Sequence, residues 1–119
     1  MMTKAYDDQN IFARILRGEI PNKTVAETEH TLAFHDIAPH TPNHILVIPK
    51  GAYVDFADFA AHATAEEITD FHRVAAKLCA DWADGYRVIS NSGTHGGQEV
   101  PHYHLHLLAG RPLGPMIQR

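Results

Sequence analysis

The chain has 119 residues, of which 45% are hydrophobic and 20% charged, as expected for one globular domain with a single core. Its net charge of -4 argues against a general nucleic-acid-binding protein, which needs a basic face, and no apolar run is long enough to span a membrane. The first ten residues lack the apolar stretch of a signal peptide, so we expect a cytoplasmic protein, and a single cysteine excludes a disulfide framework or a cysteine-rich zinc site.

The first half of the chain predicts a short helix and three strands. Residues 1–9 are polar and are expected to form a flexible N-terminal tail ahead of a single domain at 10–119. Asn10 can cap a short helix, which Gly18 ends. Strands are expected at 24–27, 31–36 and 44–48.

The second half predicts a long helix and two more strands. Thr64 to Glu67 forms a capping-box pattern, and apolar residues follow it at helical spacing as far as Trp82. A strand at 86–90, a glycine-rich loop at 91–98 and a strand at 100–108 complete the order. Because the loops between strands are short, we expect an α+β fold with a mostly antiparallel sheet of about five strands. One long and one short helix are expected to pack on one face of this sheet.

Three histidines alternate with apolar residues along the last expected strand. Because successive side chains of a strand point to opposite faces, His102, His104 and His106 are expected on one face. The residues between them are expected to reach the core. Imidazole can act as nucleophile, acid, base or metal ligand near neutral pH, so this row is the main candidate for a functional site.

Two interpretations of the histidine row are open. The three imidazoles could bind zinc, but the outer two lie about 13 Å apart along an extended strand, too far to converge easily on one ion. In the second interpretation one histidine is a nucleophile and its neighbours handle protons. The preceding loop favours this second interpretation, because Gly93, Gly96 and Gly97 let backbone N–H groups face an anion such as a phosphate.

These motifs resemble those of the histidine triad (HIT) family, in its nucleoside phosphoramidase branch. Residues 102–108 match the family's alternation of histidines and apolar residues, and the resemblance extends over about residues 10–116. The other matching motifs are Ile11-Phe12, Gly18 to Pro21, Ala33 to Ile37, Asn43 to Lys50, Gly96 to Gln98 and Gly110 to Pro112. The resemblance implies a HIT-like fold.

The resemblance also implies roles for individual residues. His104 would be the nucleophile, and the polar network around it would consist of His102, His106 and His44. Asp36 would bind the ribose, although by its pattern alone it would merely end a strand. The remaining implied contacts are a phosphate-binding set, Asn91, Gly97 and Glu99, and an apolar pocket for the base, Ile11, Phe12, Phe34, Ile37 and Leu46. By its pattern alone, Phe34 would be an ordinary core residue.

The implied activity is hydrolysis of the P–N bond of purine nucleoside 5′-phosphoramidates, or of aminoacyl-adenylate-like substrates, through a covalent nucleotidyl-histidine. A dinucleoside polyphosphate hydrolase, a nucleotidyl transferase and a nucleotide-binding regulatory module with little turnover are the alternatives. Some relatives hold zinc through paired cysteines, where this chain has Asn10 and Ala13, so neither a metal nor another cofactor is expected.

The expected partners are a purine nucleotide, with AMP or GMP as product, and a second copy of the chain in a homodimer. The resemblance implies the dimer, and the apolar stripe of the long helix supports it weakly, because such a stripe can pack within one chain or between two. The stripe consists of Phe71, Val74, Leu78 and Trp82. No nucleic-acid or membrane partner is expected.

Overall fold

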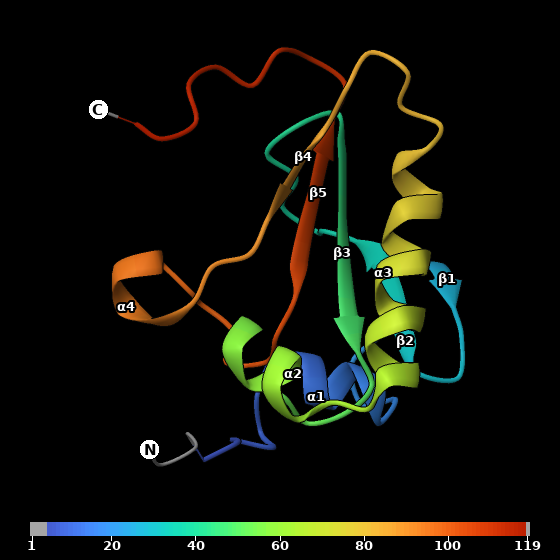
Figure 1. Cartoon of the computed structure of the whole chain (residues 1–119), viewed down its shortest axis with the longest axis vertical. Helices are drawn as coiled ribbons and strands as arrows, with labels where there is room; N and C mark the ends of the chain where they lie inside the picture. Colours follow the sequence, from blue (N-terminus) through green and yellow to red (C-terminus); the bar gives the residue numbers. More distant parts are fainter. Residues whose placement is uncertain (1–4, 119) are drawn as a thin grey trace.

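The computed structural model describes residues 5–118 and places one antiparallel sheet of five strands at the centre, with helices around it (Figure 1). The strands are β1 (Thr24–Glu27), β2 (Thr31–His35), β3 (Asn43–Pro49), β4 (Arg87–Ile89) and β5 (Leu105–Ala109), in the spatial order β1-β2-β3-β5-β4. The helices in this range are α1 (Ile11–Leu16), α2 (Phe56–His62), α3 (Ala65–Cys79) and α4 (Gly93–Gly96). The predicted α+β class with an antiparallel sheet is confirmed.

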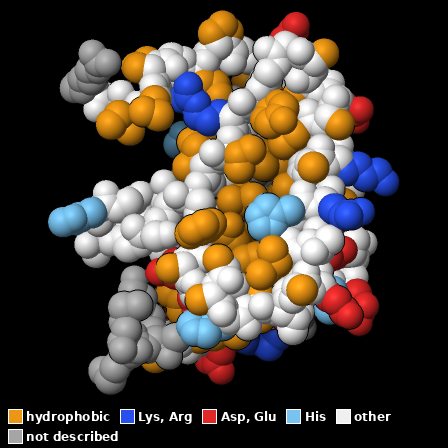
Figure 2. Space-filling view, in the orientation of Figure 1, with side chains coloured by type: hydrophobic (Ala, Val, Ile, Leu, Met, Phe, Trp, Pro, Cys, Tyr) orange, Lys and Arg blue, Asp and Glu red, His pale blue; other side chains and the backbone are white. Residues whose placement is uncertain are grey.

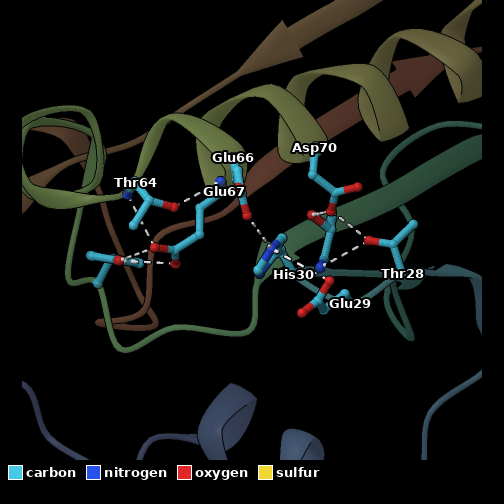
Figure 3. A network of polar contacts seen from close by, with 9 residues as sticks. Thr28, Glu29, His30, Thr64, Glu66, Glu67 and Asp70 are labelled. Atoms are coloured by element: carbon cyan, nitrogen blue, oxygen red, sulfur yellow. Dashed lines mark hydrogen bonds and ion pairs between the residues drawn. The ribbon is translucent and has the colours of Figure 1, made fainter.

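Local sequence signals determine where the two predicted helices begin. The Asn10 side chain accepts a hydrogen bond from the N–H of Ala13 and so caps α1, while Gly18 follows the helix with a φ of 80°. At the start of α3, Thr64 and Glu67 each accept a hydrogen bond from the other's backbone N–H (Figure 3). Both predicted helix starts are therefore confirmed.

A half-buried carboxylate, that of Asp70, connects α3 to the sheet. Asp70 accepts hydrogen bonds from the hydroxyls of Thr28 and Thr31, which lie in and next to the turn between β1 and β2 (Figure 3). Burial by itself raises the pKa of the Asp70 carboxyl, but the hydrogen bonds from the two hydroxyls, together with His30, outweigh it and the net pKa is lowered. The long helix is thus held in place over one face of the sheet by ionised, hydrogen-bonded contacts.

The sheet separates two apolar clusters, because β2 and β3 are buried on both of their faces. Helices α2 and α3 cover one face, where Phe59 and Phe71 pack on Val47 and Leu107. Helix α1 covers the other face with Phe12 and Ile15, over Leu32, Phe34, Leu46 and Ile48. The prediction that the helices share one face is wrong. Side chains of β2 and β3 alternate, and both faces of these strands carry apolar residues that need cover.

The prediction of one long and one short helix is also incomplete. Helix α2 has two turns, and Phe59 is its only buried residue. Its sequence therefore lacks the repeated buried apolar positions by which an amphipathic helix is recognised. Helix α4 is a single turn inside the expected glycine-rich loop, where glycine content argues against a helix. None of the helices that the structure describes is long and apolar enough to cross a bilayer.

The histidine segment forms a shorter strand than expected. The sequence predicts a strand over 100–108, whereas β5 begins at Leu105. Pro101 has no N–H for a ladder bond, and the N–H of His102 turns back to the carbonyl of Val100. The expected alternation nevertheless holds, since Tyr103, Leu105 and Leu107 all lie in the cluster under α3.

Candidate functional site

A cavity of about 500 Å³ opens on the face of the sheet that α1 covers. Its walls come from α1, from β2 and the loop after it, from β3, and from the segment leading into β5. His104 and His106 line it, as do all nine residues predicted to contact a nucleotide: Ile11, Phe12, Phe34, Asp36, Ile37, Leu46, Asn91, Gly97 and Glu99. A larger and more open hollow of about 830 Å³, next to β4, contains none of the predicted site residues.

The apolar part of the cavity consists of buried side chains at its base and exposed side chains at its opening. Phe12, Phe34 and Leu46 are buried, and the rings of Phe12 and Phe34 meet edge to face. Ile11 and Ile37 stand at the rim, with 44% and 92% of their surface exposed. Such a pocket presents flat apolar surface of the kind that a planar base can pack against.

His104 is held in one tautomer by its own backbone neighbourhood. Its Nδ1–H donates to the carbonyl oxygen of His102 at 2.6 Å, so Nε2 carries the lone pair. Every fully buried side-chain nitrogen and oxygen among the described residues has a hydrogen-bond partner, whereas His104 Nε2 has none, so Nε2 is open to the cavity. The Phe12 ring stands edge-on to the imidazole with centroids 5.0 Å apart and limits its movement.

His44 and His106 form a second, directional pair. The N–H of His40 donates to His44 Nδ1 at 3.1 Å, so the proton of a neutral His44 is on Nε2. That Nε2 lies 2.9 Å from Nδ1 of His106 and 3.4 Å from Oδ2 of Asp36. His106 therefore accepts at Nδ1 and keeps its own proton on Nε2.

Burial keeps the imidazoles of this cluster neutral. It lowers the pKa of His102 and of His106 to about 4, and in His106 the neighbouring His104 and His44 add to the effect. Burial also lowers the pKa of His104 and of His44, although Asp36 partly opposes the shift in both. At pH 7 the lone pair of His104 is therefore available for attack.

Asp36, His44 and His106 also have the composition of a metal site. One ligand atom from each lies within 4.8 Å of the others. A metal would need a lone pair on His44 Nε2, but the N–H of His40 already occupies Nδ1 as a donor, which leaves the proton on Nε2. The hydrogen bonds of this trio thus suit proton transfer better than coordination.

The glycine-rich loop is organised differently from the expected open anion cradle. The N–H groups of Gly97 and Gln98 are bound to the carbonyls of Thr94 and Gly93 in α4. Gln98, to which we assigned no role from the sequence, anchors the loop: its amide donates to the carbonyls of Val54 and Val100. Asn91, Gly97 and Glu99 still line the cavity, with Gly97 at a φ of 75°.

The charge of the cavity is unusual for an anion site. Among the described residues that line it there is no lysine or arginine, while Asp36 and Glu99 are carboxylates. A bound phosphate would have to be stabilised by amide groups and imidazole N–H rather than by fixed positive charge. Lining residues that we did not predict are Ile15, Ile20, Pro21, Asn22, His35, Ala38, His40 and Val100. Of these, helical spacing from Ile11 was a usable signal for Ile15.

Comparison with known proteins gives one consistent result. The model of the HIT domain family matches residues 17–113. An uncharacterised HIT-like protein of Azospirillum brasilense is 60% identical over 99% of both chains. The purine nucleoside phosphoramidase of Escherichia coli K12 is 45% identical, over 92% of this chain and 94% of its own.

Solved structures agree in fold. A histidine triad protein from Clostridium difficile superimposes with a TM-score of 0.79 at 38% identity, covering 95% of this chain and 100% of its own. A HIT family hydrolase from Legionella pneumophila gives a TM-score of 0.81 at 38% identity, covering 89% of this chain and 96% of its own.

Proposed function

The chain belongs to the HIT domain family, and from this premise we propose that it is a nucleotide-binding hydrolase that cleaves the P–N bond of purine nucleoside 5′-phosphoramidates. The similarity to a purine nucleoside phosphoramidase over most of both chains supports this substrate class. The observation that carries the proposal is the lone pair on Nε2 of His104: among the described imidazoles His44, His102, His104 and His106, this is the one nitrogen that holds a lone pair with no donor, and it opens to a cavity large enough for a nucleotide.

The proposed reaction has two steps. In the first, the lone pair of His104 Nε2 attacks the α-phosphorus, the P–N bond breaks, and the leaving amine takes a proton. In the second, water attacks the nucleotidyl-histidine, releases the nucleoside monophosphate and restores the free imidazole. Pre-organised N–H donors stabilise the charge on the equatorial oxygens in both steps.

His106 is the better candidate for the proton donor. Both ring nitrogens of His102 are occupied, by Tyr6 and by the Pro49 carbonyl, and the side chain is fully buried. His106 lines the cavity, lies with its ring centroid 5.0 Å from that of His104, and carries its proton on the free Nε2. A neutral His106 that donated would be left as an imidazolate, so the donating form is its imidazolium, which takes the extra proton from solvent in the cavity and returns to the neutral ring when the amine leaves.

A panel of substrates tests the proposal. Steady-state hydrolysis is measured with an adenosine phosphoramidate, with a diadenosine polyphosphate, and with a nucleotide donor plus a sugar 1-phosphate acceptor. We expect the phosphoramidate to give the highest kcat/KM, and acid-quenched samples to contain a nucleotidyl adduct on the peptide with His104. Preference for the second or third substrate would favour the alternative enzymes, and tight nucleotide binding without turnover would favour a regulatory module.

Removal of metal ions should leave the activity unchanged. We expect full turnover after dialysis against EDTA or phenanthroline, because Nε2 of His44 carries a proton and the lone pair on Nδ1 of His106 accepts it. The measurement compares initial rates before and after chelation, with added zinc as a further arm. Loss of the rate on chelation and its return with zinc would establish the metal interpretation instead.

We further propose that the protein is a homodimer that pairs across the β4 edge of the sheet. β4 is an edge strand, and Tyr86 and Val88 in and beside it are about half exposed. Figure 2 shows hydrophobic side chains gathered in a band on the face that carries α3 and β4. An edge strand beside an exposed apolar band favours association with a second copy.

Sedimentation at micromolar concentration tests the dimer. We expect a species of twice the 13.2 kDa chain mass, and expect Val88→Lys to shift it to the single chain, because a charge on the edge opposes strand pairing. Thr24→Lys on the opposite edge strand, β1, is the matched control and should leave the mass unchanged. A fully active species of single-chain mass would show that the apolar band serves the chain's own fold.

A further inference from the structure

Tyr6 contacts the site from a part of the chain in which the sequence predicts only a tail. Residues 1–4 of that tail lie outside the described residues, but the Tyr6 hydroxyl is 2.6 Å from Nδ1 of His102, 96 residues away. The two rings meet edge to face with centroids 5.6 Å apart. His102 itself is completely buried, whereas Tyr6 is partly exposed, so Tyr6 covers the buried ring from the outside.

The direction of the contact follows from the other side of the ring. His102 Nε2 lies 2.8 Å from the carbonyl oxygen of Pro49, which can only accept, so Nε2 carries the proton. Nδ1 therefore holds a lone pair and accepts from the Tyr6 hydroxyl. Both nitrogens of His102 are thus held, one by the N-terminal segment and one by the end of β3.

The same residue holds the candidate nucleophile. The backbone carbonyl of His102 accepts the Nδ1–H of His104 at 2.6 Å. Because its ring is held at both nitrogens, His102 is restrained as a residue, and a shift of its backbone would move the acceptor that fixes the tautomer of His104. Two hydrogen bonds, joined through His102 itself, therefore connect Tyr6 to the imidazole whose Nε2 faces the cavity.

The segment that carries Tyr6 is itself anchored to α1. The Asn10 amide donates to the carbonyl of Asp7, and Arg17 donates to the carbonyl of Asp8. From α1, Phe12 meets both imidazoles edge-on, with centroids 6.3 Å from His102 and 5.0 Å from His104. The N-terminal segment and α1 are thus joined to each other, and together they contact the two histidines.

We propose that Tyr6 is a positioning residue for the nucleophile: its hydroxyl fixes the tautomer and orientation of His102, whose backbone carbonyl then holds the Nδ1 proton of His104. Without the hydroxyl, a buried lone pair would lack a donor, and relieving this requires the ring to turn or water to enter. The tautomer part of the inference stands on geometry alone, whereas its effect on rate rests on the proposed phosphoramidase function.

Tyr6→Phe is the informative substitution, because it removes only the hydroxyl. We expect kcat to fall about tenfold, the change that corresponds to one lost hydrogen bond, with KM changed less than twofold. KM should hold because Tyr6 does not line the cavity. Tyr53→Phe is the matched control: it also removes one hydroxyl, which here donates to Glu67 of α3, and because Tyr53 does not line the cavity the variant should give the parent kcat.

The pH profile separates positioning from packing. The titratable groups that face the His102 ring are the Tyr6 phenol and the His104 imidazole; Asp7, Asp8 and Arg17 act on Tyr6 itself. Burial holds the pKa of His102 at about 4, so it stays neutral over the working range. In Tyr6→Ala, water should reach the ring and raise this pKa, and the acid limb of kcat/KM should move to higher pH. In Tyr6→Phe the aromatic ring still covers His102, so the acid limb of the kcat/KM profile should shift less than in Tyr6→Ala.

NMR of the histidine ring nitrogens closes the test without any substrate. We expect the unmodified protein to show His102 protonated at Nε2 and His104 at Nδ1, and Tyr6→Phe to change the nitrogen shifts of both residues. A parent protein with His102 protonated at Nδ1 would overturn the inference, even if the variant failed to fold. So would a folded Tyr6→Phe variant with unchanged shifts and unchanged kcat. Absence of phosphoramidase activity in the parent would refute the proposed function and leave the nitrogen shifts to decide the role of Tyr6.

Discussion

Replacing His104 with alanine is expected to lower kcat/KM for a phosphoramidate by several orders of magnitude, as loss of a covalent nucleophile generally does. No other group in the cluster can take over. Both nitrogens of His102 are occupied, and His106 carries a proton on its free nitrogen. The covalent nucleotidyl adduct should disappear together with turnover.

The fold and the nucleotide affinity of this variant should survive. The His104 side chain makes its hydrogen bond within its own segment and packs on Phe12 on the α1 side, and it is not part of the cluster under α3, so its loss leaves the α3-side core untouched. Equilibrium binding of AMP and thermal unfolding provide the check. His72→Ala, an exposed histidine of α3 on the opposite face of the sheet, is the matched control and should keep the full rate. A His104→Ala enzyme with near-parent activity would rule out the covalent mechanism.

Replacing Asp36 with asparagine is expected to give the second largest loss, confined mainly to substrates with both ribose hydroxyls. A carboxylate that accepts from a hydroxyl contributes about 1.5–3 kcal/mol per bond, so kcat/KM should fall roughly 10- to 100-fold. Asparagine is the sharper test than alanine, because its oxygen can still accept the N–H of Ala38, which Asp36 holds at 2.8 Å. The loop after β2 should therefore keep its shape.

The comparison with a 2′-deoxy substrate decides what Asp36 does. It lines the cavity, yet its second oxygen also lies 3.4 Å from Nε2 of His44. If ribose binding is its role, the deoxy substrate starts from a lower kcat/KM and loses much less on substitution. If the carboxylate serves mainly to orient His44, both substrates should lose the same factor, and the ribose role would be excluded.

Short-range signals in the sequence were enough to predict much of the fold. Asn10 and Thr64 mark helix starts through contacts only three residues long, and the alternation on both sides of His104 marks which side chains reach the core. The residues predicted to contact a nucleotide all line one cavity, although their individual roles remain predictions. Here the resemblance added what the pattern lacked, because Asp36 and Phe34 looked like ordinary strand residues.

The sequence by itself determined the sheet, the two capped helices and the candidate chemistry of the histidine row. Only the tertiary structure decided that helices cover both faces, that β5 starts after Pro101, and which nitrogen of each histidine carries its proton. The physical reason is the sequence separation over which each effect acts. Propensity and capping act within about one helical turn, whereas the tautomers depend on partners far away in sequence. The contacts of His102 with Pro49 and Tyr6 span 53 and 96 residues, and that of His44 with His106 spans 62. No local pattern encodes such distances, so the candidate nucleophile is recognisable from the sequence, but the contacts that set its protonation are visible only in the fold.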